Sequence, residues 1–361
     1  MAPCHRDDGL CRVSLQGFRH LHNVVLNFDP TVNVIQGANG AGKTSLLEGL
    51  YFLGRARSFI THRTARIVGK SAESVLVHGQ IRAGRTVHRL GVRYQKGQTR
   101  ARLNGYEVQV LSESAGLLPI QVINTEGQRL LTDGPKARRA FLNWGVFHVE
   151  PAYRDDWRRY QKAVRQRNVA LRAGDRRLAV AWEPEMSKAA EVVDHRRWTF
   201  LNAFMPRAME IAERWLTAYE LDWKFRPGWR VGCALAEVLA QSREREMVQG
   251  FALYGPHRAD LRLTVDGEEA AARLSRGEQK LLVAALRIAL VEHWAHRGGY
   301  RPLVLVDDLP AELDVHYREG LMKSLLASGA QVFVTTIEAD QLPGVHSGGW
   351  FHVEHGRVQG L

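Results

Sequence analysis

The segment from residue 37 to residue 44 fits the pattern G-x-x-x-x-G-K-[ST] of a phosphate-binding loop, or P-loop. Its glycines let backbone N–H groups surround a phosphate without Cβ clashes, and the N-terminus of the following helix adds partial positive charge. The lysine would reach the β- and γ-phosphates and take part in catalysis, and the threonine hydroxyl would bind Mg²⁺. A chance glycine-rich turn is the alternative, but the strand-like VNVIQ before the segment and the helical pattern after it favour a P-loop. The predicted nucleotide-binding residues are Gly37, Ala38, Asn39, Gly40, Ala41, Gly42, Lys43 and Thr44.

Two adjacent carboxylates, Asp307 and Asp308, follow the apolar run 303–306. A buried parallel strand that ends in acids places them at the edge of the sheet where ligands bind. We expect Asp307 to join the Mg²⁺ shell and Asp308 to face the attacking water. An ordinary strand that ends in a turn is the alternative in isolation, and the P-loop elsewhere in the chain favours the catalytic interpretation.

A third segment, Leu274-Ser-Arg-Gly-Glu-Gln-Lys280, begins a strongly helical stretch over residues 274–294. Ser275 and Glu278 have the S-x-x-E spacing of a capping box, in which each side chain accepts from a free backbone N–H. A serine and a glycine at a helix N-terminus also form an anion-binding site. Because the segment lies about thirty residues before the two aspartates, we expect a second phosphate-binding role in addition to the cap.

Strand patterns occupy both ends of the chain. They are β-rich runs bounded by glycine and Asp-Pro, and Asn104-Gly105 predicts a two-residue hairpin. The predicted strands cover residues 11–18, 23–28, 32–37, 73–82, 86–95, 118–124, 261–265, 303–308 and 331–336.

The middle of the chain follows a helical pattern. From about residue 135 to 249, apolar residues recur at three- and four-residue steps, and one such helix of about 35 residues would be ~50 Å long. Pro206 should kink or break it. The apolar stripe is too short for a long coiled coil and fits a helical hairpin or small bundle. We therefore predict an α/β protein in which residues 1–133 and 250–361 form one discontinuous domain and residues 134–249 form an inserted, mostly helical arm.

The composition is that of a globular protein with excess positive charge. A hydrophobic content of 45% excludes wholesale disorder, and no apolar run approaches the roughly 18–20 residues of a membrane helix. The three cysteines have no metal-ligand spacing, which favours a reducing compartment. The net charge is +12, and residues 134–249 hold 22 Lys and Arg against 15 Asp and Glu. Arginine-rich codon usage is one explanation, and a polyanionic partner such as DNA is the other.

The helical segment is the richest local source of positive charge. Arg158, Lys162 and Arg165 have the spacing that places side chains on one helix face, and they are the candidate DNA contacts. A solvated face, paired in part with nearby aspartates, is the alternative. The full basic cluster is Arg154, Arg158, Arg159, Lys162, Arg165 and Arg167, and the second candidate surface is the hairpin with Arg93, Lys96, Arg100 and Arg102.

The order of these segments, with Glu312-Leu313-Asp314 after the two aspartates, resembles that of the ABC-type ATPases, specifically the SMC-like heads that act in DNA repair. Within that branch the chain resembles the RecF family of bacterial recombination mediators. The long middle segments are more specific than the nucleotide motifs, which many ATPases share. The matching segments read GFRH, GANGAGKTSLLEGLYFLGRARSF, INTEGQRLLTDGPKARRAFLNWGVFHVEP, QRNVALR, YGPHRADL, LSRGEQKLL and DDLPAELD.

The resemblance implies that the P-loop binds ATP, that Asp307 is the magnesium carboxylate and that Asp308 occupies the position of the catalytic base. Ser275, Arg276 and Gly277 would face the ATP bound to the other subunit of a homodimer, with Ser275 and Gly277 on its γ-phosphate. Asp314 would lie at the dimer interface. Arg19, in GFRH, would reach the phosphates or remain a surface arginine, and residues 254–258 would form a structural turn first and an interface element second.

Three features depart from related ATPases. Many of them have Glu where this chain has Asp308, and the shorter side chain implies poorer water positioning and slow turnover. Transporter members usually have a histidine after the last strand, where this chain reads Val334-Thr335-Thr336-Ile337. A hydroxyl there can hydrogen-bond a phosphate but cannot act as a base near pH 7. Pro310 stiffens the turn after the two aspartates.

The resemblance further implies an ATP switch in recombinational repair and replication restart. ATP would close a homodimer on single-stranded or duplex DNA, weak DNA-dependent hydrolysis would release it, and RecO and RecR would be partners in loading recombinase, in the cytoplasm. A nucleotide-binding subunit of an ABC transporter is the first alternative, and the basic helical insertion and the missing histidine disfavour it. A P-loop kinase or nuclease is the second, and no second carboxylate cluster supports it.

Overall fold

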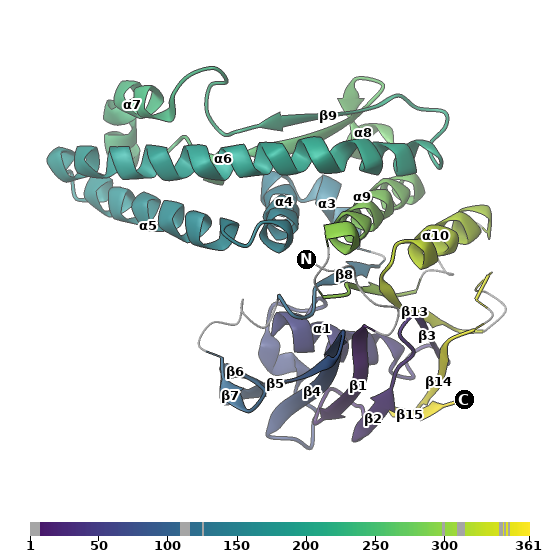
Figure 1. The fold of residues 1–361 in the computed structure, drawn as a ribbon. Coiled ribbons are helices and arrows are strands. Elements are labelled where there is room, and N and C mark those ends of the chain that lie inside the picture. The colour runs from purple at the N-terminus through teal and green to yellow at the C-terminus, as the bar shows by residue number, and fades with distance from the viewer. Residues whose placement is uncertain are drawn as a thin grey trace. The chain divides into compact units, whose positions relative to one another are not determined.

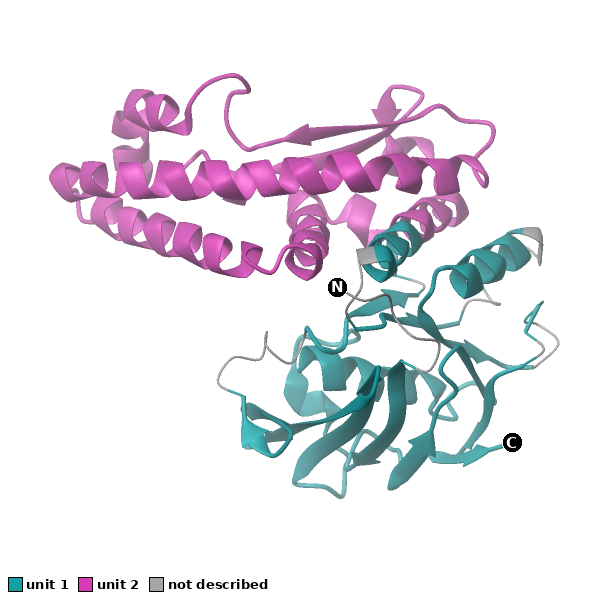
Figure 2. Ribbon diagram, viewed as in Figure 1, with its two compact units in different colours: residues 1–127, 287–361 teal, residues 128–286 magenta. Residues whose placement is uncertain are grey.

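The computed structural model describes residues 8–108, 116–124, 126–297, 300–308, 315–338, 342, 344–345 and 347–361. The chain forms two compact units, which are coloured separately in Figure 2. Unit 1 contains residues 1–127 and 287–361, and unit 2 contains residues 128–286.

The first sheet of unit 1 is antiparallel, with strand order β2-β1-β4-β5-β6-β7. Alternate residues of its strands are buried: Val75 and Val77 of β4, and Leu90 and Val92 of β5, are fully buried, whereas polar side chains occupy the opposite face. The hairpin predicted at Asn104-Gly105 joins β6 to β7. The strands are β1 (Gly9–Gln16), β2 (Val24–Asn27), β4 (Ser74–Ala83), β5 (Thr86–Gln95), β6 (Gln98–Leu103) and β7 (Tyr106–Glu107).

The second sheet of unit 1 has strand order β15-β14-β3-β13-β12-β8, and all its neighbouring strands are parallel except β14 and β15. Its central strands are buried along almost their whole length and are mostly apolar, as expected for strands covered on both faces. The strands are β3 (Val32–Gln36), β8 (Ile120–Ile123), β12 (Leu303–Val306), β13 (Gln331–Thr336), β14 (Gly349–Glu354) and β15 (Arg357–Gly360), and the unit also holds η1 (Thr64–Ile67) and α10 (Val315–Ala327).

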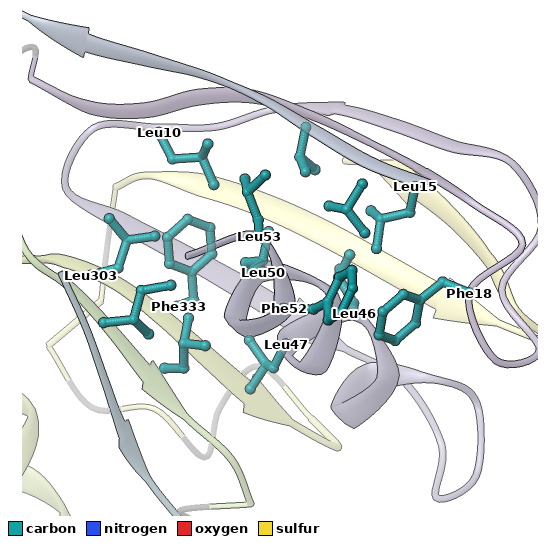
Figure 3. Packing of buried hydrophobic residues seen from close by; sticks show 14 of the residues in the cluster. Leu10, Leu15, Phe18, Leu46, Leu47, Leu50, Phe52, Leu53, Leu303 and Phe333 are labelled. Atoms are coloured by element: carbon teal, nitrogen blue, oxygen red, sulfur yellow. The ribbon is translucent and has the colours of Figure 1, made fainter. Parts of the chain in front are cut away.

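Helix α1 (Lys43–Arg55) joins the two sheets through one hydrophobic core, shown in Figure 3. Leu46, Leu47, Leu50 and Leu53 are fully buried, and the same cluster contains side chains of both sheets. At about 25 cal/mol per Å² of buried apolar surface, each such leucine contributes roughly 1.5–3 kcal/mol relative to an exposed one. Helix α1 therefore holds its N-terminal residues, Lys43 and Thr44, at a fixed place beside the edge of the second sheet.

Unit 2 consists mainly of helices, with a three-stranded sheet of order β11-β10-β9 (Figure 1). No helix in the described ranges is long and apolar enough to cross a membrane. The elements of unit 2 are α3 (Arg129–Thr132), α4 (Pro135–Val149), α5 (Tyr153–Arg172), α6 (Arg176–Glu213), β9 (Leu221–Arg226), α7 (Leu235–Gln249), η2 (Pro256–Arg258), β10 (Asp260–Val265), β11 (Glu268–Glu269) and α8 (Ala270–Arg273), and α9 (Arg276–Arg297) begins here.

Helix α6 is 38 residues long and does not end at Pro206, so the predicted break is absent. Asp175 caps its N-terminus by accepting a hydrogen bond from the N–H of Leu178 at 2.9 Å. Phe204, Met205 and Ala208 around the proline are fully buried. Their packing offsets the backbone hydrogen bond that a proline removes.

Unit 2 extends beyond the predicted insertion 134–249 at both ends. On the C-terminal side, β10 pairs with β9, so residues 260–265 complete a sheet whose other strand lies within the insertion. Arg138 of α4 also binds Asp260 through two hydrogen bonds, at 2.8 and 3.0 Å. The sequence analysis did not predict β9, although Leu221, Trp223 and Phe225 alternate with polar residues as in a half-buried strand, because the segment is short and lies within a helical region.

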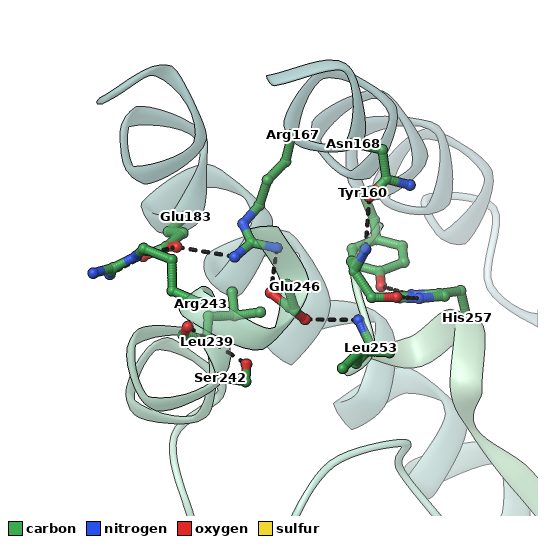
Figure 4. A network of polar contacts seen from close by, with 11 residues as sticks. Tyr160, Arg167, Asn168, Glu183, Leu239, Ser242, Arg243, Glu246, Leu253 and His257 are labelled. Atoms are coloured by element: carbon green, nitrogen blue, oxygen red, sulfur yellow. Dashed lines mark hydrogen bonds and ion pairs between the residues drawn. The ribbon is translucent and has the colours of Figure 1, made fainter. Parts of the chain in front are cut away.

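A polar cluster inside unit 2 is shown in Figure 4. Arg167 is fully buried and pairs with Glu183 at 3.0 Å and with Glu246 at 2.7 Å, and Arg243 also binds Glu183. The prediction that Arg167 belongs to a solvent-exposed basic cluster is therefore wrong. Its charge is compensated by two carboxylates, as burial of a guanidinium requires.

Candidate nucleotide-binding and DNA-binding sites

The P-loop follows β3 and ends at the first residues of α1. Gly40 and Gly42 have φ angles of 80° and 123°, which residues with a Cβ rarely adopt. A Cβ at Gly42 would also lie 3.0 Å from Nε2 of His20. The backbone of the loop therefore needs both glycines, whereas Ala38 and Asn39 are exposed at its tip.

Lys43 is nearly buried, with 6% of its surface exposed. Its Nζ donates hydrogen bonds to the carbonyl oxygens of Gly37 at 2.7 Å and of Ala38 at 3.1 Å. The ammonium group is thus held against the loop by its own backbone. This is the side of the loop on which a P-loop lysine meets phosphate oxygens.

Thr44, Asp307 and Thr335 meet at the carboxyl ends of β12 and β13. Thr44 Oγ1 donates to Asp307 Oδ1 at 3.0 Å, and Thr335 Oγ1 donates to the same oxygen at 3.1 Å. Burial raises the pKa of Asp307 above its ordinary value, and the two hydroxyl hydrogen bonds act in the opposite direction. The predicted magnesium ligands, Thr44 and Asp307, are therefore adjacent.

Asp308 has a φ angle of 58°, in the left-handed region that Asp and Asn tolerate better than most residues. Its N–H donates to Oγ1 of Thr335 at 2.8 Å, which fixes the backbone of the turn. Among the described residues, its carboxylate has no hydrogen-bond partner. The carboxylate can therefore accept a hydrogen bond from a water molecule.

Arg19 does not point freely to solvent. It forms a bidentate pair with Glu48 of α1, with two hydrogen bonds of 2.8 Å, and Ser58 donates to the same carboxylate. Glu48 is fully buried, so the pair is the compensation for a buried charge. Neither Glu48 nor Thr335 was among the predicted site residues. The spacing of Glu48 five residues after Lys43 was the available signal, since it places both on the first turns of one helix.

A cavity of about 750 Å³ is lined by residues that include Arg19, His20, Arg66 and Lys70, and its lining contains no residue of the P-loop. Its size is within the range of sites that bind small molecules.

The signature segment, residues 274–280, forms the predicted capping box in unit 2. The N–H of Ser275 donates to Glu278 Oε2 at 2.8 Å, and the N–H of Glu278 donates to Ser275 Oγ at 3.4 Å. Ser275, Arg276 and Gly277 are all exposed. A Cβ added to Gly277 would meet nothing within 4 Å, so unit 2 itself does not require a glycine there.

The candidate DNA contacts lie on α5. Arg158, Lys162 and Arg165 are exposed, as their spacing predicted. Arg158 is paired with Asp155 at 3.6 Å, as the alternative of a solvated face requires, and Arg159 with Glu185 at 2.9 Å. The helix face is therefore accessible but partly neutralised. Asp314, predicted at a dimer interface, and Pro310 lie outside the described residues.

The donor set at the P-loop fits magnesium. A hydroxyl and a carboxylate are hard oxygen ligands, and Mg²⁺ in nucleotide sites uses one or two carboxylates together with phosphate and water. Within the described residues, no group of three or more His, Cys, Asp or Glu side chains could hold a metal alone. Any ion here would thus depend on the phosphates for its remaining ligands.

Comparisons with known proteins identify the family of this chain. The family model for the RecF/RecN/SMC N terminal domain matches residues 9–356. The "DNA replication and repair protein RecF" of Thioalkalivibrio sulfidiphilus is 40% identical over 355 residues, covering 97% of this chain and 99% of the relative. That of Pseudomonas aeruginosa is 41% identical over 362 residues, covering 97% of each chain.

Solved structures show the same fold. The recombination mediator protein RecF with ATP matches with a TM-score of 0.87 and 22% identity, over 99% of this chain and 98% of that one. An Smc head domain from Pyrococcus furiosus, bound to the C-terminal domain of ScpA, matches with a TM-score of 0.60 and 14% identity over 98% and 96% of the two chains. The predicted ABC-type, SMC-head-like fold is confirmed, and the transporter alternative is excluded. The chain belongs to the RecF family of DNA replication and repair proteins.

Proposed function

We propose that this chain is an ATP-dependent DNA-binding protein of recombinational repair and replication restart. ATP closes a homodimer on DNA, and hydrolysis opens it. The chain acts with RecO and RecR in the cytoplasm to help load recombinase at gaps. It is an ATPase that works as a switch, and its hydrolysis is slow and stimulated by DNA.

One contrast carries the proposal. Unit 1 has one half of a nucleotide site, in which Lys43 donates to carbonyl oxygens of the P-loop and Thr44 donates to Asp307. In unit 2, Ser275 and Gly277 are exposed at a helix N-terminus, and the glycine has no internal reason to be one. A γ-phosphate approaching from a second subunit supplies that reason, because the absence of a Cβ lets it reach the backbone N–H groups.

Each group then has a separate role. Lys43 Nζ exchanges its carbonyl partners for phosphate oxygens. Thr44 and Asp307 hold the Mg²⁺ ion, which supplies charge stabilisation at the phosphates. Asp308 orients the attacking water and accepts its proton. Since aspartate is one methylene shorter than glutamate, turnover is slow.

Nucleotide-linked dimerisation follows from mass action. ATP that contacts two subunits stabilises only the closed dimer, so its binding free energy favours association. The basic surface of α5, with Arg158, Lys162 and Arg165, contacts the DNA backbone.

Analytical ultracentrifugation with and without ATP and duplex DNA tests the proposal. We expect a monomer without nucleotide, a dimer with ATP, and a dimer that sediments with DNA when both are present. The proposal is contradicted if the protein is a monomer under all conditions, or if it is a dimer whether or not ATP is present. Free phosphate as the product, with no phosphorylated small molecule, separates the switch from a P-loop kinase.

A further inference from the structure

The solvent face of the first sheet of unit 1 carries a row of arginines on neighbouring strands. Arg93 of β5 lies directly opposite Arg100 of β6, and Gly91 lies opposite Arg102. Arg89 of β5 and Arg12 of β1 are both in register with Gln80 of β4, so they share this face. All five arginines are exposed, whereas Leu90, Val92 and Ala101 on the same strands face the core.

These charges are not compensated within the described part of the chain. Arg100 donates to Oε1 of Gln98 at 3.1 Å, and no carboxylate lies within 4.0 Å of any of the five guanidinium groups. Glu107 is the one acid lining the surface. Like charges directly opposite on neighbouring strands destabilise a sheet, as Arg93 and Arg100 do here. An arrangement of this kind gains stability when an anion binds between the two side chains.

Four of the five arginines, all except Arg12, line a depression of about 800 Å³ together with Gly91 and His78. A Cβ at Gly91 would meet only Cδ2 of His78, at the ordinary contact distance of 3.7 Å. The fold therefore does not need glycine at this position, and glycine in a strand interior costs stability. Its place at the centre of the arginines is explained by a ligand that approaches the backbone.

The electrostatic surroundings of His78 agree with a positive surface. Burial lowers the pKa of its imidazole, and the charges of Arg89 and Arg12 lower it further. The arginines thus act together on a group at the floor of the depression. An anion bound there would have the opposite effect on this imidazole.

We propose that this arginine face binds the phosphate backbone of duplex DNA. From β1 to β6 it crosses three strand spacings of about 4.8 Å, roughly 14 Å, which is broader than one small phosphate needs. No Phe, Tyr or Trp lines the depression, so it lacks the stacking platform of single-strand binders. The inference rests on the proposed DNA-binding function and adds a contact surface in unit 1 to the one on α5.

The test is the salt dependence of duplex binding, measured with ATP, for the double variant Arg93→Ala/Arg100→Ala. The slope of log K against log salt falls in magnitude by about 1.8, which is about 0.9 for each lost phosphate contact. Between 50 and 200 mM salt the parent then loses about 12-fold more affinity than the variant. The matched control is Arg207→Ala/Arg214→Ala, which removes the same charge from two arginines that pair with Glu210 and leaves the slope unchanged.

A second variant tests the shape of the surface. Gly91→Leu keeps every charge but places a side chain in the depression. We expect it to weaken duplex binding without lowering the unfolding temperature of the protein. If the double variant has the same slope as the parent and the parent binds duplex DNA, the arginine face is not a DNA contact, and the proposed function is unaffected. If the double variant loses affinity only for single-stranded DNA, the arginine face binds single strands and the proposal of a duplex is wrong. A parent that binds no DNA at all, with ATP present, overturns the proposed function together with this surface.

Discussion

Thr44 Oγ1 donates a hydrogen bond to Asp307 Oδ1 at 3.0 Å, although 263 residues separate the two in the chain. The contact joins the start of α1 to the end of β12, and both elements belong to unit 1. The two proposed magnesium ligands are thus held next to each other by the fold of unit 1 itself. Preorganisation of this kind reduces the ordering cost of nucleotide binding.

Replacing Lys43 by Arg should abolish or strongly reduce phosphate release and leave the fold intact. The lysine fits between two carbonyl oxygens of the loop with 6% of its surface exposed, and a planar guanidinium does not match that space. Phosphate release and thermal unfolding check this. Lys224→Arg, at an exposed position of unit 2, is the control and should keep full activity. Parental phosphate release from the Lys43 variant contradicts the P-loop assignment.

Gly277→Ala should fold as well as the parent, or up to about 1 kcal/mol better, because alanine is the better helix former and its Cβ meets nothing. ATP-dependent dimerisation should nevertheless be lost, because the Cβ blocks the approach of the γ-phosphate. Ultracentrifugation and urea unfolding measure the two effects. Normal dimerisation would leave the segment with a capping role only.

Ser275→Arg and Ser275→Asp separate the cap from the phosphate site. Aspartate preserves a helix cap, whereas arginine costs about 1 kcal/mol of stability by removing it. Both should prevent ATP-dependent dimerisation while the monomer still binds ATP, the first by bulk and the second by repelling the phosphate. If the Asp variant dimerises like the parent, no phosphate contacts this residue.

Asp308→Asn should bind ATP and hydrolyse it slowly, since asparagine keeps the shape and loses the proton acceptor. Asparagine also tolerates the φ angle of 58°, so the hydrogen bond between the N–H of residue 308 and Thr335 should persist. The dimer should remain on DNA longer than the parent when ATP is present. Equal dissociation rates, measured in stopped flow, count against the switch.

Unit 2 should lose stability in mild acid because of His257. Its Nε2 donates to the carbonyl oxygen of Ala252 at 3.1 Å, so Nδ1 accepts from the hydroxyl of Tyr160 at 2.5 Å. Burial lowers the pKa of His257 from 6.5 to about 4. The unfolded chain therefore binds a proton on His257 that the folded chain does not bind between these values, so this residue lowers stability by about 2 kcal/mol at pH 5. Burial raises the pKa of Asp194 to about 6, which offsets part of this loss because the folded chain then binds the extra proton.

Urea unfolding at pH 7.5 and pH 5.0 measures this effect, followed by tryptophan fluorescence, since seven of the nine tryptophans lie in unit 2. In His257→Gln the loss of stability between the two pH values should shrink by about 2 kcal/mol. The control His62→Gln, at an exposed position of unit 1, should retain the loss of the parent. Equal losses in all three proteins would place the acid sensitivity elsewhere.

The sequence predicted those parts of the site that local pattern specifies. The P-loop, the two aspartates after a buried strand and the capping box all depend on residues close together in the chain. Arg167 is buried because it pairs with carboxylates 16 and 79 residues away. Arg19 pairs with Glu48, which is 29 residues away. Periodicity does not reveal partners at such separations. The limits of unit 2 and the strand β9 were also missed, because β9 pairs with β10, which begins only at residue 260.

The strand order of the second sheet also determines when the nucleotide site can be completed during protein synthesis. Strand β3, which leads into the P-loop, lies between β13 and β14, and the ribosome makes both neighbours about 300 residues later. At 5–20 residues per second this delay is roughly 15–60 seconds. Unit 2 is continuous in sequence and its residues emerge within that interval. All of unit 2 can therefore fold on the nascent chain while β3, the strand that leads into the P-loop, still lacks both of its neighbours.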